Sequence, residues 1–278
     1  KLCEFVQPLW LGQFDLKGKT IWVHHEQGMG DSIQFCRYIP MLAQMGAQVV
    51  LTVPQALVSL MRGLPGVSQV VESGQELPDF DCHIPMMSLP LAFKTELHHI
   101  PFAQGYIQAD PIKSQHWHER LGPRQRLRVG LVWNGGFRAD QPDLWSTNAR
   151  RNIELHQVAQ ALQDVSVDFY SLQKGDPAEA EILGREHEFW PQGNFHNHAA
   201  ALKDFSDTAA LIDNLDLVVS VDTSTAHLAA AMGKPTWILN RFDTCWRWLL
   251  ERNDSPWYRA VKLYRQDSTR SWTPVLEQ

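Results

Sequence analysis

Short apolar runs alternate with stretches of helical periodicity along most of the chain. In the first third, runs with strand character occupy 20–24, 49–53, 67–71 and 82–85, a loop and a helix occupy 28–46, and a second helix occupies 55–62. Near-continuous apolar runs of this length are typical of strands that are buried on both faces of a parallel sheet. The alternation therefore predicts a βαβαβ unit with right-handed crossovers.

A second alternating set follows a polar stretch. Residues 108–126 carry Pro111, Gly122 and Pro123 among polar residues, which predicts an interdomain linker. Beyond it we expect strands at 129–133, 167–172, 217–221, 236–239 and 261–264, and helices at 154–162, 206–214 and 225–232. Residues 174–204 carry no clear pattern. The expected fold class is α/β, with two Rossmann-like, doubly wound domains that face each other across a cleft.

The domain limits that follow from this pattern are 1–115 for the first domain and 116–245 for the second. We expect the remaining segment, 246–278, to pack back toward the first domain. Ligands of such folds bind at the carboxyl ends of the strands, so the strand-to-helix junctions are the places to search for function.

The junction at 215–235 is the most informative. A buried strand ends at Val221, and Asp222, Thr223, Ser224 and Thr225 then supply oxygens and free backbone N–H groups at a helix start. A helix start at the carboxyl end of a parallel strand attracts an anion, most often a phosphate. Ordinary N-capping by Thr or Ser explains the same residues about equally well.

The first strand leads into a glycine-containing turn with Gly28, Gly30 and Asp31. The glycines allow close backbone approach or a positive φ, and Asp31 could accept a proton from a hydroxyl nucleophile. The alternative for Asp31 is an N-cap or a first-turn acid favoured by the dipole of the helix. The third glycine of the dinucleotide fingerprint is missing, as are the Walker pattern and the G-x-S-x-G elbow, which disfavours an NAD enzyme, a P-loop NTPase or an α/β-hydrolase.

Two further junctions offer polar side chains. Asn134 follows one expected strand, and Gln173 and Lys174 follow another. Arg151, after a long polar loop, could point a guanidinium at a diphosphate. A surface arginine and a solvated turn are the plain alternatives. Paired histidines such as His98 and His99 rarely form a metal site without a third ligand in register, so we expect no metal.

Composition narrows the partners. The net charge of −6 and the 44% hydrophobic content indicate a protein with a full core that does not bind nucleic acid. No apolar stretch reaches the roughly 18 residues of a membrane span. The four scattered cysteines form no C-x-x-C pair, which suits a reducing cytoplasm. The chain begins with Lys rather than Met, so we expect a fragment or processed chain with further sequence upstream.

Together these junctions resemble glycosyltransferase family 9, the heptosyltransferase-like family, and in particular the branch found in bacterial tetratricopeptide-repeat proteins. The resemblance runs from Gly18 to Gln266 through HHEQGMGDSIQFCRYIPML, LRVGLVWNGG, RRNIEL, VDFYSLQKG, DFSDTAALIDNLDLVVSVDTSTAHLAAAMGKPTWIL and WRWLLERNDSPWY. Many relatives have Gly in place of Ser224.

The resemblance implies the GT-B fold, with an acceptor domain first and a nucleotide-sugar-binding domain second. It implies Asp31 as the general base, Arg151 near the donor diphosphate, and Asp222, Thr223 and Ser224 at the donor phosphates and sugar. His227 falls in the same block with a less defined role. The full set of expected donor-binding residues is Gly28, Gly30, Asn134, Arg151, Gln173, Asp222, Thr223, Ser224, Thr225 and His227.

The leading hypothesis is a metal-independent glycosyltransferase without a cofactor. It moves a sugar from an ADP- or UDP-linked donor to a hydroxyl on a glycan or protein, with inversion favoured by the resemblance. If tetratricopeptide repeats precede the chain, a protein acceptor becomes more plausible. The alternatives are a catalytically inert nucleotide-sugar-binding or scaffold module, and an epimerase of the same two-domain fold.

Overall fold

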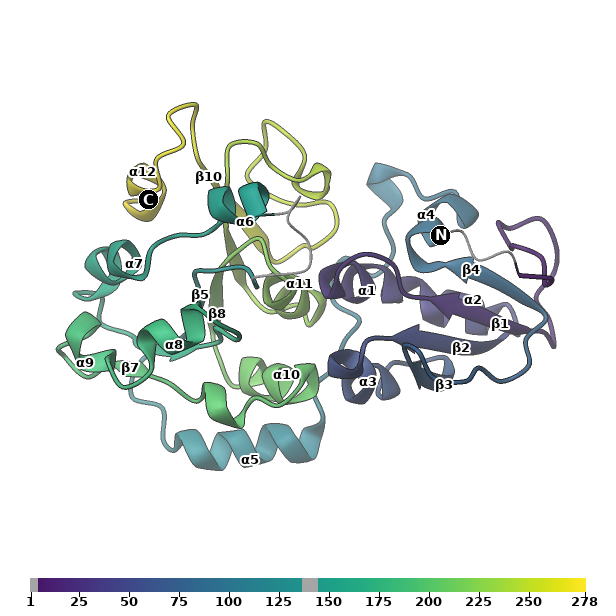
Figure 1. Ribbon diagram of the computed structural model, residues 1–278, viewed down its shortest axis with the longest axis horizontal. Coiled ribbons are helices and arrows are strands. Elements are labelled where there is room, and N and C mark those ends of the chain that lie inside the picture. The colour runs from purple at the N-terminus through teal and green to yellow at the C-terminus, as the bar shows by residue number, and fades with distance from the viewer. Residues whose placement is uncertain (1–4, 137–144) are drawn as a thin grey trace.

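The computed structural model describes residues 5–136 and 145–278, which form two α/β layers joined side by side (Figure 1). Each layer is built around its own sheet of parallel strands. The first contains a four-stranded sheet in the order β3-β2-β1-β4. Its elements are β1 (Thr20–His24), α1 (Met29–Phe35), η1 (Cys36–Tyr38), α2 (Ile39–Gln44), β2 (Gln48–Val53), α3 (Gln55–Arg62), β3 (Val67–Glu72), β4 (Cys82–Pro85), η2 (Met86–Ser88), α4 (Leu89–Ala92) and η3 (Leu97–His99).

The second layer contains a six-stranded parallel sheet in the order β10-β9-β8-β5-β6-β7. Its elements are α5 (Pro111–Leu121), β5 (Arg128–Val132), α6 (Trp145–Arg151), α7 (Leu155–Leu162), β6 (Asp168–Ser171), α8 (Ala178–Ile182), α9 (Glu186–Phe189), β7 (Phe195–His196), η5 (Ala199–Ala201), α10 (Phe205–Asp213), β8 (Leu217–Val221), α11 (Ser224–Ala231), β9 (Thr236–Asn240), η6 (Trp246–Trp248), β10 (Val261–Arg265) and α12 (Thr273–Leu276).

The strand orders confirm the predicted fold class. In the first sheet the chain order reverses between β1 and β4, and in the second between β5 and β8. Loops that leave neighbouring strands at such a reversal diverge to opposite faces and open a crevice at the carboxyl ends. The crevice of the first sheet therefore lies at the loop before Asp31, and that of the second at the loops after Val132 and Val221.

The predicted linker is wrong in one respect, because its middle is a helix. Asp110 caps α5 through Oδ1, which accepts hydrogen bonds from the backbone N–H groups of Ile112 and Lys113 at 2.9 and 3.0 Å. Pro111 fits the first helical position, where its missing N–H is not needed. The helix packs on α10, and the Lys113 ammonium lies 2.7 Å from Asp207. The two prolines and the glycine that suggested a loop instead mark the two ends of this helix.

The C-terminal segment connects both layers. Its strand β10 forms the edge of the second sheet beside β9. Before that strand, Trp246 and Trp257 lie against Phe35 of the first layer, with ring centroids 6.5 and 5.7 Å away. The buried Arg37 donates a 2.8 Å hydrogen bond to the carbonyl of Trp257. The limits assigned to the domains remain a prediction, with 246–278 contributing to both.

Candidate active site

A polar cavity of about 670 Å³ lies between the two layers. It is bordered by the starts of α1 and α11, which pack against each other at the centre of the molecule (Figure 1). Residues from both layers and from the C-terminal segment line it: Gln27, Gly28, Met29, Gly30, Asp31, Gly135, Gly136, Asn148, Arg151, Asp222, Thr223, Ser224, His227, Arg241, Cys245 and Arg247. It thus gathers most of the predicted site residues in one place.

The start of α11 confirms the capping interpretation of its sequence, and the anion site there stays a prediction. Thr223 is the N-cap, and its Oγ1 accepts a 3.3 Å hydrogen bond from the backbone N–H of Ala226. Thr223 and Ser224 also border the cavity with Asp222. Capping therefore does not compete with anion binding here, because the first N–H groups of a helix outnumber what one cap can satisfy.

The two carboxylate oxygens of Asp31 have different hydrogen-bond partners. Its Oδ2 accepts a 2.8 Å hydrogen bond from the backbone N–H of Gly28, which closes the first turn of α1. Its Oδ1 accepts a hydrogen bond from Nη2 of Arg247, and the carboxylate faces the cavity. Asp31 is therefore an acid in the first turn of α1, whose N-cap is Gly28, and its role as a base stays a prediction.

The two glycines of the first turn, Gly28 and Gly30, differ in whether the structure requires a glycine there. Gly28 has φ −99° and ψ 164°, an extended conformation that any residue adopts, while the positive φ of 55° falls on Gln27. A Cβ on Gly30 would lie 2.9 Å from Cδ2 of His227. The close approach expected at Gly30 thus exists, and the neighbour is helix α11.

Arg151 reaches the cavity from the last residue of α6, where the helix dipole favours a cation. Its Nη1 donates a 2.8 Å hydrogen bond to the carbonyl of Asp222, and its guanidinium covers Gly135 so closely that a Cβ there would be 2.0 Å from Nη2. Most of the polar loop before this helix, residues 137–144, lies outside the described residues.

Asn134, Gln173 and Thr225 border a second cavity of about 250 Å³, which shares Met29, Gly136, Thr223 and Ser224 with the first. The side-chain amide of Gln173 is engaged by the protein. Its Oε1 accepts from the backbone N–H groups of Trp133 and Asn134, and its Nε2 donates to the Asn134 carbonyl at 3.0 Å. Gln173 therefore shapes the turn after β5, and its contact with a donor remains a prediction.

His227 is almost fully buried behind this site. Its Nδ1 lies 2.8 Å from the hydroxyl of Tyr258, and its Nε2 lies 3.8 Å from Oδ1 of Asp222. Burial, followed by the charge of Arg247, lowers the pKa of His227 from 6.5 to about 3. The ring is therefore neutral, and it supports the helix and Asp222 rather than carrying a positive charge.

Two arginines of the cavity, Arg241 and Arg247, were not expected from the sequence. Both belong to the segment after β9, where the sequence predicted no site residue. The signal was the charge at Arg247 between Trp246 and Trp248. A charged residue that stays buried in an aromatic stretch needs a specific partner, but the sequence does not show where in the chain that partner lies.

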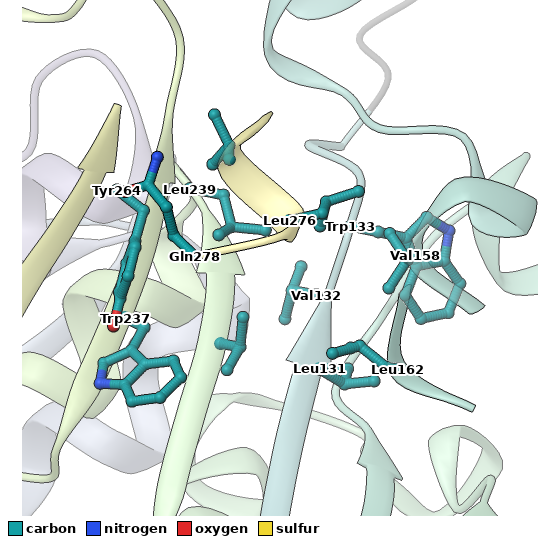
Figure 2. Close-up of a pocket in the computed structure, with 12 residues that line it drawn as sticks. Leu131, Val132, Trp133, Val158, Leu162, Trp237, Leu239, Tyr264, Leu276 and Gln278 are labelled. Atoms are coloured by element: carbon teal, nitrogen blue, oxygen red, sulfur yellow. The ribbon is translucent and has the colours of Figure 1, made fainter. Parts of the chain in front are cut away.

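The described residues contain two other features of interest. An apolar cavity of about 70 Å³ lies on the outer face of the second sheet, where Leu131, Trp237, Leu239 and Leu276 surround it (Figure 2). Glu96, His98 and His99 could gather around a metal, and all three are exposed. Neither feature belongs to the polar cavity.

Comparisons with known proteins give a family match over part of the chain. Residues 153–239 match the sequence profile of "Glycosyltransferase family 9 (heptosyltransferase)". The match includes the start of α11 and helix α10, and it ends within β9.

Two further comparisons cover most of this chain. FlbA of Caulobacter vibrioides is 26% identical over 96% of this chain, which spans 46% of the length of FlbA. Two solved structures share the fold. The family 9 glycosyltransferase of Veillonella parvula matches with a TM-score of 0.63 and 11% identity, and the match covers 91% of this chain and 87% of that one. The E. coli ADP-heptose lipopolysaccharide heptosyltransferase II matches with a TM-score of 0.60 and 13% identity, and the match covers 90% of this chain and 91% of that one. The two parallel sheets are thus those of a GT-B heptosyltransferase fold. In the described part of the chain, no helix combines the length and hydropathy needed to cross a bilayer.

Proposed function

We propose that this chain transfers a sugar from a nucleoside-diphosphate donor to a hydroxyl group on a glycan or protein. The observation that carries the proposal is the shared cavity, in which the start of α11 and the carboxylate of Asp31 face the same space. An anion site and a base are the two parts that glycosyl transfer requires, one for the leaving group and one for the acceptor.

The two connected cavities suit the parts of such a donor. The smaller one has apolar walls from Val132, Leu172 and Leu202, which suit a nucleobase. Thr223 and Ser224 lie where the two cavities meet, so a diphosphate there would receive backbone N–H groups of α11. The sugar would then lie in the larger cavity. The donor is ADP- or UDP-linked in this proposal, and the E. coli heptosyltransferase that shares the fold is named for ADP-heptose.

The chemical step follows from this placement. Asp31 accepts the proton of the acceptor hydroxyl as its oxygen bonds to the anomeric carbon. The bond from that carbon to the diphosphate oxygen breaks, and the nucleoside diphosphate leaves with the electron pair. Attack from the face opposite the leaving group inverts the anomeric centre. Arg151, Arg241 and the start of α11 would offset the developing negative charge without a metal.

An Asp31→Asn variant tests this proposal against an inert binding module. A thermal-shift screen with ADP-, UDP-, GDP- and dTDP-sugars first identifies the donor. A ligand at 100 times its Kd adds about 2.7 kcal/mol to the free energy of unfolding, which such a screen detects. A transferase then loses about 10²–10⁴-fold in turnover on Asp31→Asn while it keeps donor affinity. Equal binding with no turnover in either form would support the inert module, and conversion of the donor sugar without an acceptor would support an epimerase.

The cellular setting belongs to the same proposal. The chain covers less than half of FlbA, so upstream tetratricopeptide repeats, and with them a protein acceptor, remain proposals. The described cysteines, Cys36, Cys82 and Cys245, are free thiols, which agrees with the reducing cytoplasm that we propose as the location.

A further inference from the structure

The side chain of Arg247, in the C-terminal segment, contacts the candidate base Asp31. It lies on η6 and is separated from Asp31 by 216 positions in the sequence, yet its Nη2 donates a hydrogen bond to Oδ1 of Asp31. The two side chains are only 10% and 13% exposed. An ion pair of this kind is far more specific in its geometry than a surface pair between mobile chains.

The guanidinium of Arg247 is fixed from several sides. Its Nε donates a 2.8 Å hydrogen bond to Oε1 of Gln34, and its Nη1 lies 3.0 Å from Sγ of Cys245. Its central carbon lies 4.6 Å from the centroid of the Trp246 ring. Each nitrogen of the guanidinium therefore has its own partner, and the one that faces Asp31 has a fixed position.

The Asp31 carboxylate is held at both oxygens. The backbone N–H of Gly28 fixes Oδ2 from the helix that carries Asp31, and Arg247 fixes Oδ1 from outside that helix. A carboxylate offers about four acceptor sites, so these two bonds leave room for a substrate hydroxyl. Without Arg247 the carboxylate would be anchored at one oxygen and could rotate.

We propose that Arg247 is a positioning residue for the transfer reaction, which orients the Asp31 carboxylate toward the acceptor. This inference rests on the proposed function and adds the C-terminal segment to the machinery. Because Asp31 neutralises the charge of Arg247, the role differs from that of Arg151 and Arg241, which serve the donor diphosphate in the proposed reaction.

The test measures nucleoside diphosphate release from each donor of the thermal-shift panel, with water or a supplied acceptor. Affinity for ADP and UDP is measured separately by calorimetry. We expect Arg247→Ala to lower kcat by about 10–100-fold, since small misplacements of a reacting group have effects of this size. We expect the Kd for the nucleoside diphosphate to stay unchanged. Arg247→Lys keeps the charge but not the three fixed donors, so its kcat should lie between those of the wild type and Arg247→Ala.

Two measurements separate positioning from a merely structural role. Asp31→Asn combined with Arg247→Ala should turn over no more slowly than Asp31→Asn alone, because groups that act as a unit are not additive. Dilute guanidinium chloride should restore part of the activity of Arg247→Ala, while sodium chloride at the same ionic strength should not. Arg252→Ala is the matched control, because Arg252 belongs to the same segment and pairs with the exposed Asp254 at 2.7 Å.

The outcomes are distinct. Wild-type turnover in Arg247→Ala, additive losses in the double variant, or a weakened Kd for the nucleoside diphosphate would each overturn the positioning role and leave the transferase proposal standing. Loss of turnover in Arg247→Ala and Arg247→Lys alike, with a matching fall in Tm and no rescue by guanidinium, would assign Arg247 to stability alone. Absence of wild-type turnover with every donor in the thermal-shift panel would remove the transferase proposal, and this role with it.

Discussion

Helices α1 and α11 meet at Gly30, and a single methyl group there tests the centre of the molecule. In Gly30→Ala the new Cβ would lie 2.9 Å from Cδ2 of His227, a distance that real Cβ contacts essentially never show. The His227 ring has no room to move, because the Tyr258 hydroxyl holds its Nδ1 at 2.8 Å and the Trp248 ring stacks on it at 5.2 Å. The helices must therefore separate slightly.

The size of the effect follows from two opposing terms. Overpacking in a closed interface costs about 1–3 kcal/mol, whereas Ala in place of Gly favours a helix by up to about 1 kcal/mol. We expect packing to prevail, with a net loss of about 1–2 kcal/mol in the free energy of unfolding. Because α1 also carries Asp31, turnover should fall as well.

Urea unfolding followed by tryptophan fluorescence measures this difference. Gly63→Ala is the control, since Gly63 has a helical φ of −83° and its Cβ would meet only the Leu60 carbonyl oxygen at 3.5 Å. That variant should be neutral or more stable by about 0.4–1 kcal/mol. If Gly30→Ala is as stable as Gly63→Ala, the packing of α1 on α11 described above is incorrect.

Two further predictions concern charge. The pKa of His227 is lowered to about 3 in the folded protein, so below pH 6.5 the unfolded chain binds a proton that the folded chain does not, and stability should fall by up to about 1.4 kcal/mol per pH unit toward pH 3. His227→Gln should flatten this slope in urea unfolding at a series of pH values, and an unchanged slope would contradict the assignment. The Arg241 side chain is 12% exposed, and its Nε and Nη1 have no hydrogen-bond partner among the described residues. Arg241→Gln should weaken ADP or UDP binding by about 10–100-fold, the effect of one charge-assisted hydrogen bond, and leave adenosine or uridine binding unchanged in calorimetry; an equal effect on nucleoside and diphosphate would exclude a phosphate contact.

Much of the fold could be predicted from local pattern. The expected strand at 20–24 and the helix at 55–62 match β1 and α3, and the strand at 217–221 matches β8. These elements carry their signal within a few residues, because burial on both faces requires a continuous apolar run. Helix α5 was missed since its sides are mostly polar, and the only residue that it buries is Trp117.

Some residues of the candidate site could likewise be predicted from local pattern, and others could not. Asp31, Thr223 and Ser224 lie at strand-to-helix junctions, where topology alone directs them to the crevice. Arg247 could not be found in this manner, because its contact with Asp31 depends on how the C-terminal segment returns to the first layer. The hydrogen bond from the Gly28 N–H to the Asp31 carboxylate and the contacts of Gln173 with the turn after β5 also depend on side-chain geometry that sequence spacing does not fix.

A crystal structure of the protein with bound ADP or UDP tests the central claim most directly. We predict that the two phosphates contact the backbone N–H groups at Ser224 and Thr225, with Arg151 beside them and the base among the apolar walls of the smaller cavity. A nucleotide bound outside these two cavities, or phosphates turned away from the start of α11, would contradict the account.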